Sequence, residues 1–187
     1  MLGKLIRNLL GTFRRTPAAD GNLTAPLAST LDAALGHQKI GQFAEAERIC
    51  REILRIHPDN IDVLHLLGNA VREQGRLDEA IELLQRLTAR APRMAMAHFD
   101  LGEAFRARDD MARAALHYQR AIDIEPSFAA AHNNFGSTLR ALGQLEMSII
   151  AYRRAIELCP DLVDAHYNLA NALFIDGRDL KEVIRIY

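Results

Sequence analysis

Four of the six prolines in this chain of 187 residues recur at a constant interval of 34 residues, at Pro58, Pro92, Pro126 and Pro160. Proline cannot continue a helix, because it lacks a backbone N–H and its ring clashes with the preceding turn. A constant interval of this length indicates a chain built from equal supersecondary units. Such a repeat has to be tested before any single element is assigned, since it decides the whole fold.

Other residues recur at the same interval. If the proline is set at place 32, the units span 27–60, 61–94, 95–128 and 129–162, with a partial fifth unit at 163–187. Place 8 holds only small residues and place 15 mostly glycine, which can adopt the left-handed backbone that ends a helix. Small residues let two helix axes approach to about 8–10 Å. The residues at place 8 are Ala34, Gly68, Gly102, Gly136 and Ala170, and those at place 15 are Gly41, Gly75, Asp109, Gly143 and Gly177.

This pattern resembles the tetratricopeptide repeat, whose 34-residue unit has small residues at places 8, 20 and 27 and proline at place 32. The resemblance covers residues 27–187. It implies an all-α fold, an α-solenoid in which antiparallel helix pairs form a right-handed superhelix. Two departures predict irregular packing around the second and third units: Leu87 occupies place 27, and Asp109 replaces the glycine of the turn.

Composition argues against several classes of protein. There are 23 basic and 24 acidic residues, a formal net charge of −1, which argues against binding to nucleic acid by general phosphate neutralisation. Cys50 and Cys159 lie far apart and have neither metal-binding nor disulfide spacing. No apolar run approaches the roughly 18 residues of a membrane span. We therefore expect a cytoplasmic protein that binds no nucleic acid.

Residues 1–26 differ from the repeats. Their basic residues are Lys4, Arg7, Arg14 and Arg15, and Asp20 is their one acid. Apolar residues from Leu2 to Phe13 follow one helix face. We predict a basic amphipathic helix over residues 1–15 and a linker over 16–26. The helix can pack on the first repeat or remain a mobile leader, or it can contact an anionic membrane surface or a partner's groove.

The fifth unit stops before its second helix is complete. With one residue inserted near Asp179, the apolar residues from Leu180 to Tyr187 fall in places of that helix. A solenoid needs a capping element, because its terminal repeat otherwise exposes an apolar face. Two explanations remain open: the polypeptide is a piece of a longer array, or its uncapped C-terminal helix associates with a second copy.

The resemblance also implies a concave groove, lined by places 2, 5, 6, 9, 12 and 13 of the first helix of each unit, that binds an extended peptide. An asparagine amide both donates and accepts, so it can hold a peptide backbone unless it is merely solvated. The arginines at place 12 favour carboxylate-bearing ligands unless Glu73 and Glu103 neutralise them. The groove candidates are Asn69, Arg72, Arg106, Asn133, Asn134, Arg140, Asn168 and Asn171.

Two narrower sequence patterns within the family involve these places. Asn134 and Asn168 at place 6, with the runs 131–136 and 164–172, resemble the superhelical repeats of O-linked N-acetylglucosamine transferase. The carboxylate clamp of chaperone-binding tetratricopeptide domains is not matched, because Ala130 and Asn134 stand where it needs basic residues. We therefore do not expect capture of a chaperone C-terminus.

His98, His132 and His166 recur at place 4. Equivalent atoms of successive units lie at least about 8–10 Å apart, whereas metal ligands converge about 2 Å from one ion. These histidines are therefore predicted to replace the half-buried aromatic residue of the family and not to bind metal.

The sequence has no Gly-rich phosphate loop and no serine or zinc hydrolase motif, so we expect no cofactor and no enzymatic activity in this chain. Three hypotheses about function remain open. The chain is an interaction scaffold for a peptide or protein, the substrate-recognition part of a longer transferase, or a membrane-peripheral assembly protein anchored by residues 1–15.

Overall fold

A computed structural model describes residues 25–177 of the chain, and side chains from residue 28 onward. The predictions for residues 1–24 and for the end of the fifth unit, 178–187, lie outside the described residues. Within the described range the chain is helical with short loops and has no strand, so the all-α prediction is confirmed. The helices are α2 (Ala25–Lys39), α3 (Phe43–Ile56), α4 (Ile61–Glu73), α5 (Leu77–Arg90), α6 (Ala95–Ala107), α7 (Met111–Ile124), α8 (Ala129–Ala141), α9 (Leu145–Leu158) and α10 (Val163–Ile175).

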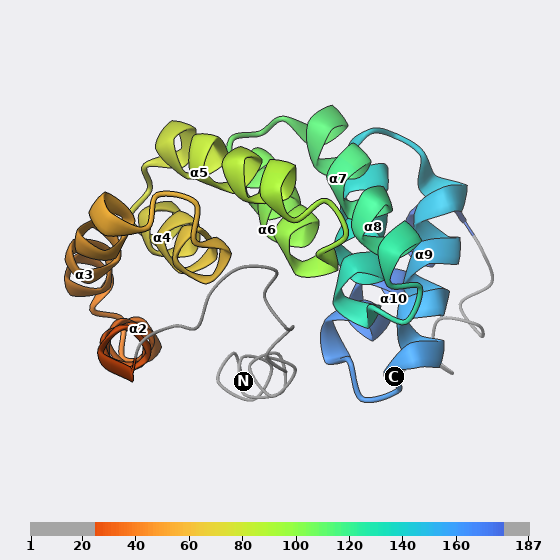
Figure 1. Ribbon diagram of the computed structural model, residues 1–187. Helices are drawn as coiled ribbons and strands as arrows, with labels where there is room; N and C mark the ends of the chain where they lie inside the picture. Colours follow the sequence, from red (N-terminus) through yellow and green to blue (C-terminus); the bar gives the residue numbers. More distant parts are fainter. Residues whose placement is uncertain (1–24, 178–187) are drawn as a thin grey trace.

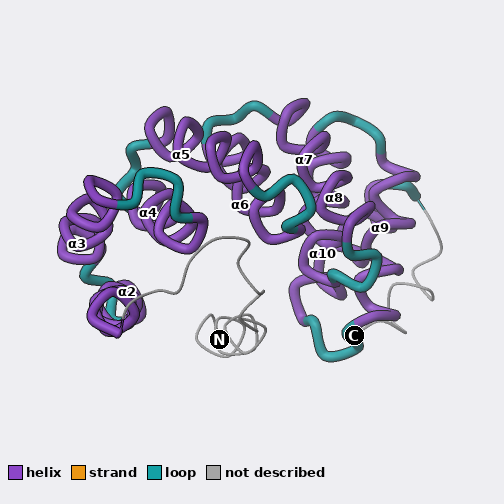
Figure 2. The backbone as a smooth tube through the Cα atoms, in the orientation of Figure 1, coloured by secondary structure: helices purple, strands orange, loops and turns teal. Residues whose placement is uncertain are grey.

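The helices form an arch of antiparallel pairs (Figure 1). The even-numbered helices from α2 to α10 line its inner side, and the odd-numbered helices lie outside them. Each helix packs against the next in the chain, and α2 contacts α4, α4 contacts α6 and α8 contacts α10. The loops that join them are short (Figure 2). Because contacts join only near neighbours in the chain, the architecture is a solenoid.

Glycine at place 8 permits the close approach within a pair. A Cβ atom added there would lie 2.8–2.9 Å from a side chain of the following helix, well inside ordinary van der Waals contact. That side chain stands at place 24 and is fully buried. The three contacts are Gly68 with Leu84, Gly102 with Tyr118 and Gly136 with Tyr152.

The turn within the third unit keeps the geometry of the others although it lacks glycine. The glycines at place 15 have φ angles of 70–79°, and Asp109 has a φ of 64°. Aspartate tolerates this left-handed conformation better than most residues do. Leu87, the other departure from the family pattern, is fully buried. The substitution at the turn therefore leaves the backbone there regular.

Histidines at place 4 bind the carbonyl group of the proline that precedes their unit. The Nε2 atoms of His98, His132 and His166 lie 3.2, 3.0 and 2.8 Å from the carbonyl oxygens of Pro92, Pro126 and Pro160. In the second unit Leu64 occupies place 4, and Arg86 donates to the carbonyl of Pro58 instead, at 2.9 Å. The histidines therefore tie each helix pair to the loop before it, a hydrogen-bonding role that the spacing did not predict.

Three properties of the described residues bear on membrane spanning, metal binding and thiol chemistry. No helix there is long and apolar enough to cross a membrane. No three His, Cys, Asp or Glu side chains among these residues gather to hold a metal ion. Burial raises the pKa of Cys50 to about 12, so this thiol is protonated at neutral pH and is a poor nucleophile.

Candidate peptide-binding groove

Polar side chains join each inner helix to the next, beginning at α4 and α6. His65 Nε2 lies 2.5 Å from Asp100 Oδ2, and Asn69 Nδ2 donates to the same oxygen at 3.1 Å. Both His65 and Asp100 are buried. Burial lowers the pKa of His65, but the charge and hydrogen bond of Asp100 outweigh it, so the pKa is raised. The imidazolium form of His65 can therefore neutralise the Asp100 carboxylate inside the groove.

The second junction, between α6 and α8, centres on Glu103. Its Oε1 accepts from Asn134 Nδ2 at 2.7 Å and from the Tyr118 hydroxyl, and its Oε2 accepts from Arg106 at 2.8 Å. Burial raises the pKa of Glu103, but the hydrogen bonds from Arg106 and Tyr118 outweigh it, so the pKa is lowered. Glu103 is therefore an ionised acceptor with its charge balanced by Arg106.

The third junction, between α8 and α10, is built from neutral groups. Asn168 Nδ2 donates to Asn133 Oδ1 at 3.0 Å and lies 3.4 Å from Ser137 Oγ. Asn133 in turn donates to Asn134 Oδ1 at 3.1 Å. Arg106 and Tyr118 only support Glu103, and we call the other eight residues of these three junctions the polar ladder: His65, Asn69, Asp100, Glu103, Asn133, Asn134, Ser137 and Asn168.

Two of the three arginines at place 12 are paired within the chain. Arg72 pairs with Glu73 at 2.8 Å, and Arg106 with Glu103 at 2.8 Å. Arg140 is exposed and forms no ion pair with a described residue. Glu73 and Glu103 therefore neutralise Arg72 and Arg106, which is one of the two alternatives that the sequence left open.

A cavity of about 220 Å³ opens between α6, α8 and α10. It contains four of the eight predicted groove residues, Arg106, Asn133, Asn134 and Asn168, together with Ser137, Asp164 and Tyr167. The other four predicted residues, Asn69, Arg72, Arg140 and Asn171, do not line it.

Asp164 and Tyr167 of α10 were not among the predicted residues. They stand at places 2 and 5 of their unit, which the family resemblance already counted among the groove places. The sequence therefore carried the signal for these two residues, although only asparagines and arginines were predicted to line the groove.

The sequence of the chain matches several models of one protein family. Models described as tetratricopeptide repeat match residues 26–93, 65–127 and 117–149, and one described as TPR repeat matches residues 136–177. Together these matches run from the first described helix pair to α10. The sequence alone had led to the same family.

Similar folds occur in several solved structures. A crystal structure of MamA protein is 25% identical with a TM-score of 0.74, over 85% of this chain and 86% of that chain. MamA 41-end from Desulfovibrio magneticus RS-1 is 20% identical with a TM-score of 0.76, over 85% and 89%. The first TPR of Spaghetti (RPAP3) bound to the HSP90 peptide SRMEEVD is 25% identical with a TM-score of 0.61, over 63% and 93%. With the family matches, these likenesses establish that the chain belongs to the tetratricopeptide repeat family.

Proposed function

We propose that this chain is a scaffold that binds a peptide or protein segment along the inner side of its arch. The observation that carries this proposal is the cavity between α6, α8 and α10, whose lining combines three asparagine amides with a hydroxyl, a cation and a carboxylate. An extended peptide offers unpaired backbone donors and acceptors, and asparagine amides can pair with both. The Spaghetti (RPAP3) domain, similar in fold, has a bound peptide.

The size of the cavity favours part of a peptide over a cofactor. Sites for small molecules usually measure about 300–1,000 Å³, and this cavity measures about 220 Å³. That is room for one large side chain with a short length of backbone. The rest of a bound segment would lie along the open inner side of the neighbouring helices.

The α4 and α6 end of the groove is a poor place for the terminal carboxylate of a peptide. Asp100 stands at place 6, where the carboxylate clamp has an asparagine, and its side chain is buried against His65. A second carboxylate there would have to compete with Asp100 for the imidazolium of His65. We therefore propose binding of an internal peptide segment and not capture of a C-terminus.

We also infer that the described part of the chain performs no catalysis. Its inner polar side chains are joined in hydrogen-bonded junctions spread over four helices, and no serine or cysteine nucleophile lies beside a histidine base in them. A role as the recognition part of a transferase, or as a membrane-peripheral protein, remains a prediction from the sequence.

Peptide selection with matched variants tests the proposal. Dodecapeptides are selected from a random phage-displayed library on the whole chain, resynthesised with a fluorophore and titrated by fluorescence polarisation. We expect the double variant Asn134→Ala, Asn168→Ala to bind them at least roughly tenfold more weakly, because the hydrogen bonds of two half-buried amides to the peptide, worth about 1 kcal/mol each, are lost.

The control is the double variant Gln85→Ala, Gln119→Ala, which removes two exposed amides from the outer helices α5 and α7. Circular dichroism has to show that all variants keep the helical content of the parent chain. Equal affinity of both double variants for every selected peptide would place the binding surface elsewhere.

A further inference from the structure

The cavity between α6, α8 and α10 has one carboxylate that no described residue neutralises. Asp164 lines the cavity and has no hydrogen-bond or ion-pair partner among the residues from 25 to 177. At the α6 end, by contrast, Arg106 is held by Glu103 at 2.8 Å. The charges at the α6 end cancel, and the lining as a whole is left with the negative charge of Asp164.

An aromatic ring stands next to this carboxylate. Tyr167 also lines the cavity, and it is 57% exposed, so much of its ring is open to a ligand. Residues three apart on a helix share a face, so Asp164 and Tyr167 present their side chains together. A carboxylate beside an open aromatic face attracts a cation by ion pairing and by the cation–π interaction.

A helix N-terminus gives Asp164 a second role that has to be separated from binding. Asp164 is the second residue of α10 (Val163–Ile175), and an acid there interacts favourably with the helix dipole. That interaction affects stability, but it explains neither the exposed ring beside the carboxylate nor the position of both at one cavity. The two roles are separable, because only one of them depends on the ligand.

We infer that the α10 end of this cavity selects a lysine or arginine side chain of the bound peptide, with the cation between Asp164 and Tyr167 and the adjoining backbone against Asn134 and Asn168. This inference rests on the proposed peptide-binding function and adds the chemistry of the partner. It reverses the preference for acidic ligands that the arginines at place 12 suggest by themselves, since two of those arginines are paired internally.

The same selected dodecapeptides test the inference. We expect lysine or arginine to be enriched at one aligned position, and replacement of that residue by uncharged norleucine to weaken binding roughly five- to tenfold, the sum of an exposed ion pair and a cation–π contact. The loss should shrink in 0.5 M sodium chloride, because salt screens exposed charges.

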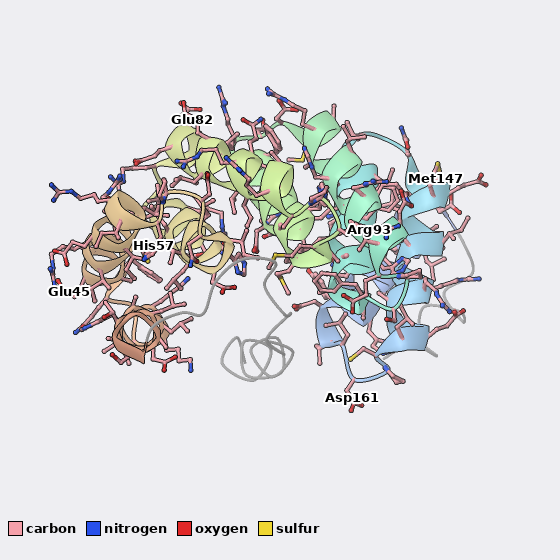
Figure 3. The ribbon with its side chains drawn as sticks, in the orientation of Figure 1. Glu45, His57, Glu82, Arg93, Met147 and Asp161 are labelled. Carbon is pink, nitrogen blue, oxygen red and sulfur yellow. The ribbon has the colours of Figure 1, made fainter. Side chains whose placement is uncertain are left out.

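Variants of the chain identify the selecting group. Asp164→Asn should reduce the difference between the lysine and norleucine peptides to the roughly twofold effect of the cation–π contact, and Tyr167→Leu should reduce the difference about twofold. The charge-matched control is Asp161→Asn, because Asp161 lies in the loop before α10 and points away from the arch (Figure 3). It should discriminate between the two peptides as the parent does. Urea denaturation of each variant measures the helix-dipole contribution separately.

The outcomes distinguish the two proposals. Peptides that depend on Asn134 and Asn168 but show no basic preference, or a preference that Asp164→Asn leaves intact, would overturn the inference and leave the proposed function standing. If no peptide depends on the two asparagines, the groove itself is wrong. A basic preference that Asp164→Asn weakens and Asp161→Asn leaves unchanged supports both.

Discussion

Replacing glycine by alanine should have opposite effects at two positions of the arch. Gly102 in α6 faces Tyr118 of α7, and an added Cβ would lie 2.8 Å from the ring atom Cε1. Gly36 in α2 has nothing within 4 Å of the same added atom. Both are helical, so both substitutions gain the same helix propensity, and only one introduces a clash.

The magnitudes follow from these two terms. Alanine in a helix interior is favoured over glycine by about 0.8–1 kcal/mol, so Gly36→Ala should raise the free energy of unfolding by nearly that amount. At Gly102 the Tyr118 ring would have to move by several tenths of an ångström, although it is fully buried and its hydroxyl is bound to Glu103. Overpacking of this kind costs about 1–3 kcal/mol. The net effect of Gly102→Ala is a loss of up to about 2 kcal/mol, whereas Gly36→Ala gives a gain.

Urea denaturation followed by far-UV circular dichroism measures both effects, with the parent chain and the two variants at equal concentration. The urea midpoints of the variants can be compared only if the free energy of unfolding falls with urea concentration at the same slope in each, because repeat arrays can unfold in stages. If Gly102→Ala stabilised the chain as much as Gly36→Ala does, the close packing of α6 on α7 would not limit the size of the residue at place 8.

Two further predictions concern the turn at Asp109 and the side chain of His117 in α7, whose ring stacks on that of His98. Asp109→Gly should raise the free energy of unfolding by about 0.5–1 kcal/mol, because glycine adopts the left-handed φ of 64° without strain; an unchanged urea midpoint would count against strain there. Burial, with a smaller effect from His98, lowers the pKa of His117 from its ordinary 6.5 to about 4. The unfolded chain then binds more protons between these values, so His117 makes the fold lose stability as the pH falls from 6.5 towards 4. Urea midpoints across this range should fall less for His117→Gln than for the parent, and parallel curves would exclude His117 as the source.

The repeat of proline carried most of the information about the fold. Helices α4, α6, α8 and α10 each begin three residues after a proline of the series, because proline ends the preceding helix and leaves room for one short loop. The spacing could not indicate what holds these loops. The histidine bonds to the proline carbonyls depend on side-chain direction, which a period of 34 residues does not specify.

The 34-residue spacing of equivalent places also could not predict which groove residues pair with one another. The ladder joins residues separated by 35 positions, as in His65 with Asp100 and Asn133 with Asn168, or by 31, as in Asn69 with Asp100. These separations are the 34-residue period plus one and minus three. They differ from the period because a side chain of one inner helix contacts a residue of the next inner helix that lies near, but not at, the equivalent place. A search for polar residues at these two separations would have found the ladder.

The polar ladder has a consequence for the entropy of binding. Amide side chains on a solvated helix sample several rotamers, and fixing each one at an interface costs about 0.5–1.5 kcal/mol. Asn134 and Asn168 already donate within the chain, at 2.7 and 3.0 Å, so folding has restricted them before any ligand arrives. An incoming segment therefore meets a preorganised surface, and more of its contact energy remains as affinity.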